Sequence, residues 1–153
     1  MDRGRTNRIR RISCVALCLI LFIGCLTGSG TVDTARAKTS TYWIHAYCEG
    51  SGVANSKKLI VRADVKKKKI YLKGIGYKTK SSKFTTAKKY KKKYSNKAIK
   101  VASGLKYTDE DVYAMGYDYF TFEQAFGSSN TVYGPLVSIK VVGGRVKLIR
   151  CSS

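Results

Sequence analysis

The segment 137–151 is the most restrictive part of this sequence, because two runs of alternating apolar and polar residues flank the pair Gly143-Gly144. Alternation with a period of two is typical of strands that bury one face, and two glycines supply the backbone torsions of a two-residue turn. The segment therefore predicts a tight β-hairpin in which Lys140 faces Lys147. Its predicted core face consists of Val137, Ile139, Val141, Val146 and Leu148.

The same alternation predicts further strands earlier in the chain. The aromatic and β-branched residues of 41–48 predict a strand. Residues 59–65 and 70–77 predict a second hairpin, joined by the short turn Lys66–Lys69. Another short strand begins near Ile99. Two glycines in the run 70–77, Gly74 and Gly76, indicate a bend or bulge.

One short helix is expected between the strands. Thr121 and Gln124 have the spacing of a capping box, and Gly127 is placed to end a single turn over 122–126. Residues 78–96 have no clean apolar period and predict an exposed, basic and partly ordered segment, with a helix over 86–94 as the alternative. Strands and helices do not alternate along the chain. We therefore predict a mainly β fold, a small antiparallel sheet or open barrel of about six short strands with one short helical turn, after an N-terminal signal peptide.

The first 37 residues have the three parts of a signal peptide. An arginine-rich start precedes an unbroken apolar run over 14–26, which is shorter than the roughly 20 residues of a membrane span. Ala35-Arg36-Ala37 then matches the small-x-small pattern at which signal peptidase cuts. We expect cleavage after Ala37 and one secreted β-rich domain over 38–153, without a transmembrane span. Acylation of Cys25 and an uncleaved anchor are the alternatives.

The balance of charge makes anionic polymers the first partners to consider. The chain has 30 Lys and Arg against 9 Asp and Glu, a formal net charge of +21. The charge is segregated: residues 57–106 hold 19 basic side chains and one acid, whereas residues 107–136 hold five acids and no base. A surface that only kept the protein soluble would mix the two signs.

Lysines interleaved with aromatic rings form the candidate site. Lysine attracts phosphate as a point charge, and aromatic rings stack on bases or sugars. Binding by such a surface would be electrostatic, salt-sensitive and weakly selective. The predicted anion-binding residues are Lys66, Lys67, Lys68, Lys69, Lys88, Lys89, Lys91, Lys92, Lys93, Lys140 and Lys147, with Tyr90 and Tyr94 as stacking residues. The alternatives are a solvated, solubilising face and, for Lys140 and Lys147, neutralisation by an acid of 107–123.

Two cysteines remain after the leader, Cys48 near one end of the domain and Cys151 near the other. Outside the cytoplasm such a pair predicts a structural disulfide, and the alternative is two separate reduced thiols. The leader, the use of lysine and the β-hairpins are similar in composition to small secreted proteins of Gram-positive bacteria. This similarity adds no site residue.

No catalytic, metal or cofactor motif is present in the sequence. His45 is the only histidine, and on a strand it points away from Cys48, so the two do not form a catalytic pair. One histidine and two distant cysteines are too few for a transition-metal site. The acids Asp109, Glu110 and Asp111 fit the first turn of a helix capped by Thr108 better than a calcium loop.

We therefore expect a non-enzymatic domain that binds an anionic cell-wall or extracellular polymer, with nucleic acid of any sequence included. Two other hypotheses remain. One is an inhibitor or receptor ligand that uses the aromatic and acidic segment 113–126 as its contact surface. The other is a small hydrolase with an unrecognised carboxylate site.

Overall fold

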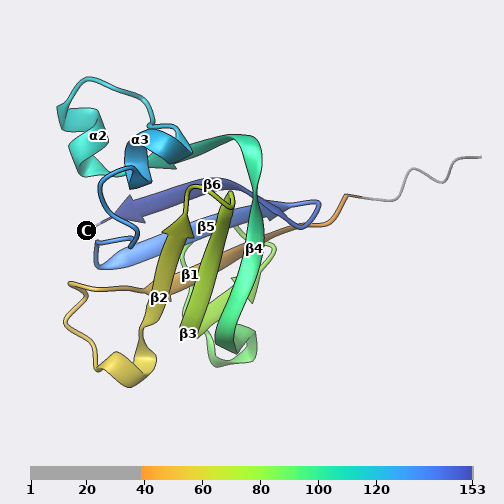
Figure 1. Cartoon of the computed structure of the whole chain (residues 1–153). Helices are drawn as coiled ribbons and strands as arrows, with labels where there is room; N and C mark the ends of the chain where they lie inside the picture. Colours follow the sequence, from red (N-terminus) through yellow and green to blue (C-terminus); the bar gives the residue numbers. More distant parts are fainter. Residues whose placement is uncertain (1–38, 153) are drawn as a thin grey trace, which may run out of the picture. The chain divides into compact units, whose positions relative to one another are not determined.

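The computed structural model describes residues 39–152, and this part of the chain is mainly β (54% strands). It contains six strands and a few short helices, whose arrangement is drawn in Figure 1. The strands are β1 (Thr41–Tyr47), β2 (Leu59–Asp64), β3 (Lys69–Thr79), β4 (Lys91–Thr108), β5 (Leu136–Val142) and β6 (Arg145–Ser152). The α-helices are α2 (Glu110–Ala114) and α3 (Phe122–Phe126), and the 3-10 turns are η1 (Asn55–Lys57) and η2 (Lys88–Tyr90). The predicted leader and its cleavage site lie outside the described residues.

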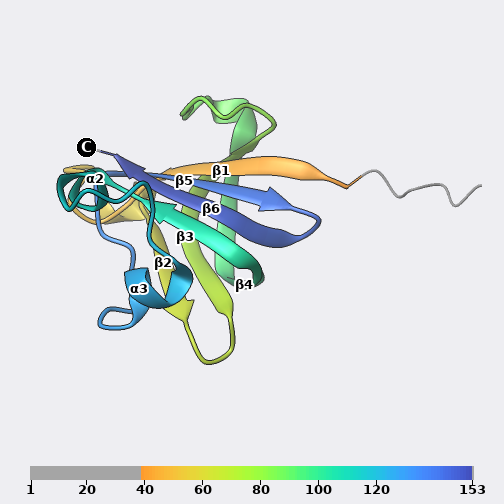
Figure 2. The same cartoon turned by 90° about the horizontal axis from the view of Figure 1, so that it is seen from above.

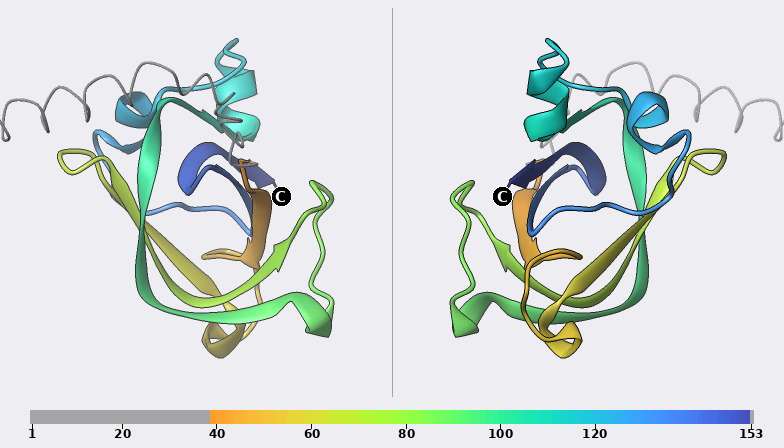
Figure 3. Two further views of the ribbon diagram at one scale, coloured as in Figure 1. Left: turned by 90° about the vertical axis from the view of Figure 1, so that its right-hand side faces the viewer. Right: turned by 90° about the vertical axis from the view of Figure 1, so that its left-hand side faces the viewer.

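Five of the strands close into a barrel. The sheet order is β1-β5-β6-β4-β3-β2, and β1 also pairs with β3 through Trp43–Thr79 and its neighbours. This additional pairing closes the ring and leaves β2 outside it. β3 is the only strand that pairs with β2 in the sheet, and the other edge of β2 forms backbone hydrogen bonds with residues 130–132. Figure 3 shows the closed wall from two sides. The predicted mainly β fold with about six strands is confirmed, and closure removes the sheet edges that an open barrel would expose.

One strand pair differs from the predicted antiparallel arrangement. β4 and β6 run parallel, with Val101 opposite Val146. A parallel pair requires a long crossover connection. Here the connection contains residues 109–135 with both α-helices and then β5, which returns antiparallel before β6 begins. The acidic segment is therefore the crossover of the barrel.

The C-terminal hairpin forms around Gly143-Gly144 as predicted, but its register shifts after two residue pairs. Val141 pairs with Val146, and the preceding residue, Lys140, then pairs with Leu148. Lys147 is the extra residue of a β-bulge, so the predicted Lys140–Lys147 pair is wrong. The shift also moves the core face of β6 from Leu148 to Ile149, which is fully buried.

The basic segment is more ordered than predicted. β4 starts at Lys91 and runs for 18 residues, so residues 91–96 belong to a strand, and the alternative helix over 86–94 reduces to the turn η2. The β3–β4 register shifts between Leu72 and Gly74, but the extra residue of this bulge belongs to β4, whereas the bulge was predicted in residues 70–77. Gly74 has φ of 122°, and a Cβ there would lie 2.2 Å from the Lys58 carbonyl oxygen.

The caps of the two helices follow the local sequence. The Thr121 hydroxyl accepts a hydrogen bond from the Gln124 N–H, and the Gln124 side chain accepts one from the Thr121 N–H, which confirms the predicted capping box of α3. The Asp109 carboxylate accepts a hydrogen bond of 2.9 Å from the Val112 N–H. Asp109, one residue later than the expected Thr108, therefore caps α2.

Candidate anion-binding surface

The predicted lysines gather at two ends of β3. Lys66–Lys69 form the tip of the β2–β3 hairpin, and Lys69 pairs with Lys100. Lys88–Lys93 form η2 and the start of β4, where Lys91 pairs with Tyr77 near the other end of β3. Figures 1 and 2 show the hairpin tip and η2 on opposite sides of the barrel. The two clusters are joined by the outer face of β2, β3 and β4.

Most of these lysines have no acidic partner within the described part of the chain. Lys69 and Lys140 are half-buried and the other nine predicted lysines are exposed. Among residues 39–152 the ion pairs are Lys58–Glu49 at 3.7 Å and Lys67–Asp64 at 3.6 Å. The Lys67 side chain is 67% exposed, and ion pairs at such surface positions contribute little stability. The charge of the basic stretch is therefore available to a bound anion.

Lys140 and Lys147 lie apart from the two clusters, on β5 and β6. The Lys140 Nζ lies 5.8 Å from the centre of the Trp43 ring, and Lys147 is exposed at the bulge. The structure does not bring these two lysines together as an opposed pair. They add to the general positive field and form no common site.

The two predicted stacking residues, Tyr90 and Tyr94, differ in how far their rings are buried. Tyr90 is half-buried in η2, and the Lys89 Nζ lies 5.0 Å from the centre of its ring. Tyr94 is only 5% exposed and packs in the core, where its ring covers Gly76. The prediction of Tyr94 as a stacking residue is therefore wrong. Its hydroxyl has no hydrogen-bond partner, and burial raises its pKa to about 12.

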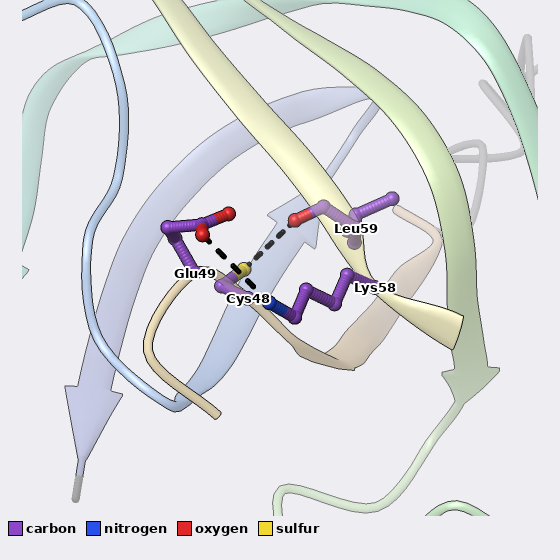
Figure 4. Close-up of polar contacts among 4 residues, drawn as sticks. All are labelled: Cys48, Glu49, Lys58 and Leu59. Carbon is purple, nitrogen blue, oxygen red and sulfur yellow. Dashed lines mark hydrogen bonds and ion pairs between the residues drawn. The ribbon is translucent and has the colours of Figure 1, made fainter. Parts of the chain in front are cut away.

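The predicted disulfide is not formed in the structure. Cys48 and Cys151 are both free and buried. The Cys48 N–H bonds to Pro135, which precedes β5, and Cys151 pairs with Val137 of β5. The two cysteines therefore lie on opposite sides of β5. The Cys48 thiol instead donates a hydrogen bond of 3.0 Å to the Leu59 carbonyl, beside the Lys58–Glu49 ion pair (Figure 4).

We expect both thiols to be unreactive in the folded protein and reactive after unfolding. Burial raises the pKa of Cys48 to about 12 and that of Cys151 to about 11, so at pH 8 almost no thiolate is present. Labelling with a thiol reagent, without any reductant, measures this directly. In the protein without residues 1–37, which contain the other three of the five cysteines, two thiols should react in denaturant, and far fewer without it. If no thiol reacts in denaturant, the two cysteines form the disulfide that the sequence predicted.

His45 connects two separate parts of the fold through its ring nitrogens. Its Nε2 lies 3.0 Å from the Ser81 carbonyl, which only accepts, so Nε2 carries the proton and donates. The Ser138 hydroxyl then donates to Nδ1 at 2.8 Å. The ring is fully buried and contacts Phe84 edge-on. His45 therefore fixes the segment 80–87 against β1, which explains why both faces of β1 are buried.

Acid should loosen this contact. Burial lowers the pKa of His45 below 6.5, because both ring nitrogens lie in a site that suits the neutral form. The unfolded chain binds this proton more readily, so the stabilisation is complete above about pH 6.5 and is lost as the pH falls toward the folded pKa. The single histidine gives one imidazole resonance, which NMR can follow against pH. A midpoint at or above 6.5 would contradict the assignment.

The acidic crossover exposes aromatic and apolar side chains. Tyr113 is 62% exposed, Met115 63% and Tyr117 54%, whereas Phe122 and Phe126 are buried in the core. The contact segment predicted over 113–126 is thus divided, and its exposed rings lie within 113–119. A hollow of about 350 Å³ next to it is lined by residues that include Asp109, Asp111, Phe126 and Tyr133. Residues 39–152 contain no group of three or more His, Cys, Asp or Glu side chains that could hold a metal ion.

Sequence analysis missed a second group of basic and polar side chains on the outer face of β2, β3 and β4. A groove of about 730 Å³ there is lined in part by Arg62, Lys73, Lys93 and Asn96. The only sequence signal was the alternation in the β2–β3 hairpin, which places Arg62 and Lys73 on its outward face. Asn96 has φ of 56°, and the sequence gives no sign that its strand is irregular at that point.

Comparison of the chain with protein-family models, with curated proteins and with solved structures found no match in any of the three. Within the described residues, no helix has the length and apolar character required to cross a membrane.

Proposed function

We propose that this protein is a secreted, non-enzymatic domain that binds anionic polymers of the cell envelope or the extracellular space through lysine charge. The observation that carries the proposal is the segregated basic surface of residues 57–106, of which only Lys58 and Lys67 have an acid partner among residues 39–152. Export, the absence of catalysis and retention at the cell surface are parts of the same proposal.

Both charge and shape support binding along an extended polymer. The two lysine clusters lie at the ends of β3, and a strand rise of about 3.3 Å per residue separates Lys69 from Tyr77 by roughly 26 Å. A polymer with regularly spaced anions can contact both clusters at once, and each contact releases counterions. Small five-stranded barrels, for example the OB-fold, bind oligonucleotides and oligosaccharides on one outer face, although a fold alone does not decide the ligand.

Salt-dependent retention tests the proposal. The purified protein should be held on heparin, on polyphosphate and on an immobilised single-stranded oligonucleotide at low salt. The logarithm of the binding constant should fall linearly with the logarithm of the salt concentration. A neutral polysaccharide column serves as the control and should not retain the protein. Elution from every anionic column at about 0.1 M salt would contradict the proposal, because surface charges are only partly screened there.

The exposed rings of 113–119 favour one other function, a protein-binding surface. Isolated apolar side chains are common on surfaces, whereas Tyr113, Met115 and Tyr117 are neighbours in one segment. An inhibitor or receptor ligand would bind through these rings, and its affinity would change little with salt. The salt dependence of binding therefore distinguishes the two functions.

A further inference from the structure

A small hollow of about 80 Å³ lies on the outer face of β2, β3 and β4, at the end of the 730 Å³ groove. Its lining comes from three strands. Ile60 and Arg62 belong to β2, Tyr71 and Lys73 to β3, and Asn96 to β4. Four of these five side chains carry hydrogen-bond donors, and two of them are cationic.

Strand register explains why these side chains meet. Arg62 pairs with Tyr71 and Ile60 pairs with Lys73, so all four lie on one face of the hairpin. That face points outward, because the residues between them form the core. The buried neighbours are Val61, Ile70 and Leu72.

A β-bulge brings Asn96 into the same group. Gly74 pairs with Tyr94 and Leu72 with Lys97, so two residues of β4, Ser95 and Asn96, lie opposite the single residue Lys73. Asn96 adopts the left-handed conformation, with φ of 56°. Asparagine tolerates this conformation better than most residues. A bulge changes the direction of side chains, and here the irregular residue is one of those that line the hollow.

The positive charge in the hollow is not neutralised by the protein. Neither Arg62 nor Lys73 forms an ion pair within residues 39–152. Arg62 also lines three larger hollows of about 340, 540 and 730 Å³. It is the only arginine of the basic stretch, and arginine alone offers a planar pair of donors for an oxyanion.

We propose that this hollow binds one phosphate group of the anionic polymer, with Arg62, Lys73 and Asn96 as its ligands. This inference rests on the proposed function and adds a discrete site to it. Donors from three strands surround the space, which suits a tetrahedral group with oxygens in several directions better than a planar carboxylate. Ile60, 43% exposed, and the ring of Tyr71 supply apolar surface for the carbon backbone between phosphates.

The test uses the purified protein and inorganic phosphate, followed by amide chemical shifts. Phosphate should cause saturable shifts at Arg62, Lys73 and Asn96, and equal concentrations of chloride should not. Arg62→Gln should weaken this binding about tenfold, because a charge-assisted hydrogen bond is lost. Arg145→Gln removes the same charge from the exposed start of β6, three strands away from β2 in the sheet, and should change affinity by less than about twofold. Equal effects of the two substitutions would overturn the site.

Asn96→Gly separates a ligand role from a structural one. Glycine prefers the positive φ of this position, so the variant should be at least as stable as the wild type. It lacks the side-chain amide, and its affinity for phosphate should fall. Unchanged affinity would remove Asn96 from the site. Titration with sulfate provides the comparison of anions, and tighter binding of sulfate than of phosphate would contradict the assignment to phosphate.

The two proposals fail in different ways. Retention of the wild type on all anionic polymers without phosphate-induced shifts in the hollow would overturn the site and leave the proposed function intact. Shifts in the hollow without retention on any polymer would overturn the proposed function. Oligothymidylate and poly(glycerol phosphate) then distinguish the source of the phosphate, and Arg62→Gln should weaken binding of whichever polymer the protein prefers.

Discussion

Replacement of Gly74 by alanine should destabilise the protein by roughly 3–5 kcal/mol, the largest effect that we expect from any single added methyl group. The new Cβ would lie 2.2 Å from the Lys58 carbonyl oxygen, and that oxygen accepts a hydrogen bond of 2.9 Å from the Ile75 N–H. The neighbouring backbone must therefore move. The φ of 122° adds further strain. A thermal melt should show a Tm lower by about 10–20 °C.

Gly104→Ala is the matched control for this prediction. Gly104 also has a positive φ, of 71°, but a Cβ there would meet nothing within 4 Å. This variant should lose only the conformational term of about 1–2 kcal/mol. The difference between the two variants measures the contact with Lys58. If both lose the same stability, the close approach of β2 to β3 does not constrain the barrel.

The parts of the fold that depend on local chemistry could be predicted from the sequence. Gly143-Gly144 and Lys66–Lys69 mark turns between alternating runs, and Thr121 with Gln124 marks a helix start. Closure of the barrel could not be predicted, because the β1–β3 and β4–β6 pairings join segments that are far apart in the chain. Such pairings leave no signal in either segment alone. The bulge at Lys147 could not be predicted either, because the alternation of apolar and polar residues continues through it.

The sequence was sufficient to predict the positive charge of the candidate site, but not the arrangement of its side chains. Exposed lysines are visible in a sequence as runs of like charge, and nine of the eleven predicted ones are exposed. Tyr94 was misassigned because it lies among lysines, and only its neighbour across the sheet, Gly76, reveals that space exists for a buried ring. The hollow around Arg62 requires the register of three strands and an irregular residue at Asn96, so no single segment indicates it.

Tyr90 is the remaining stacking candidate, and its substitution separates nucleic acid from other polymers. Tyr90→Ala should cost roughly 1–3 kcal/mol in binding to a single-stranded oligonucleotide if a base stacks on the ring. The same variant should bind poly(glycerol phosphate) as well as the wild type, because that polymer has no bases. Equal affinity of wild type and variant for both polymers would show that the ring, which already contacts Lys89, serves the fold alone.

Reversal of charge at Lys91, Lys92 and Lys93 should have the largest effect on binding. All three are exposed at the start of β4 and have no ion pair within residues 39–152. Substitution by glutamate removes three favourable contacts and adds three repulsive charges. Affinity for a single-stranded oligonucleotide near 0.15 M salt should fall roughly 10–100-fold or more, and the salt slope should decrease by about 2.

The matched control reverses the same number of charges elsewhere, at Lys140, Arg145 and Lys147. Lys140 lies on β5, and Arg145 and Lys147 lie on β6. Arg145 pairs with Lys100 of β4, beside Lys69 and nine residues along the strand from Lys91, so this variant leaves the Lys91–Lys93 cluster unchanged. If the polymer follows the face formed by β2, β3 and β4, this variant should lose much less affinity than the Lys91–Lys93 variant, because exposed charges farther apart than about 8 Å are largely screened near 0.15 M salt. Equal losses would show that net charge alone governs binding. If the Lys91–Lys93 variant elutes from heparin at the same salt concentration as the wild type, these lysines form only a solvated face, and the exposed rings of 113–119 then become the leading candidate for the binding surface.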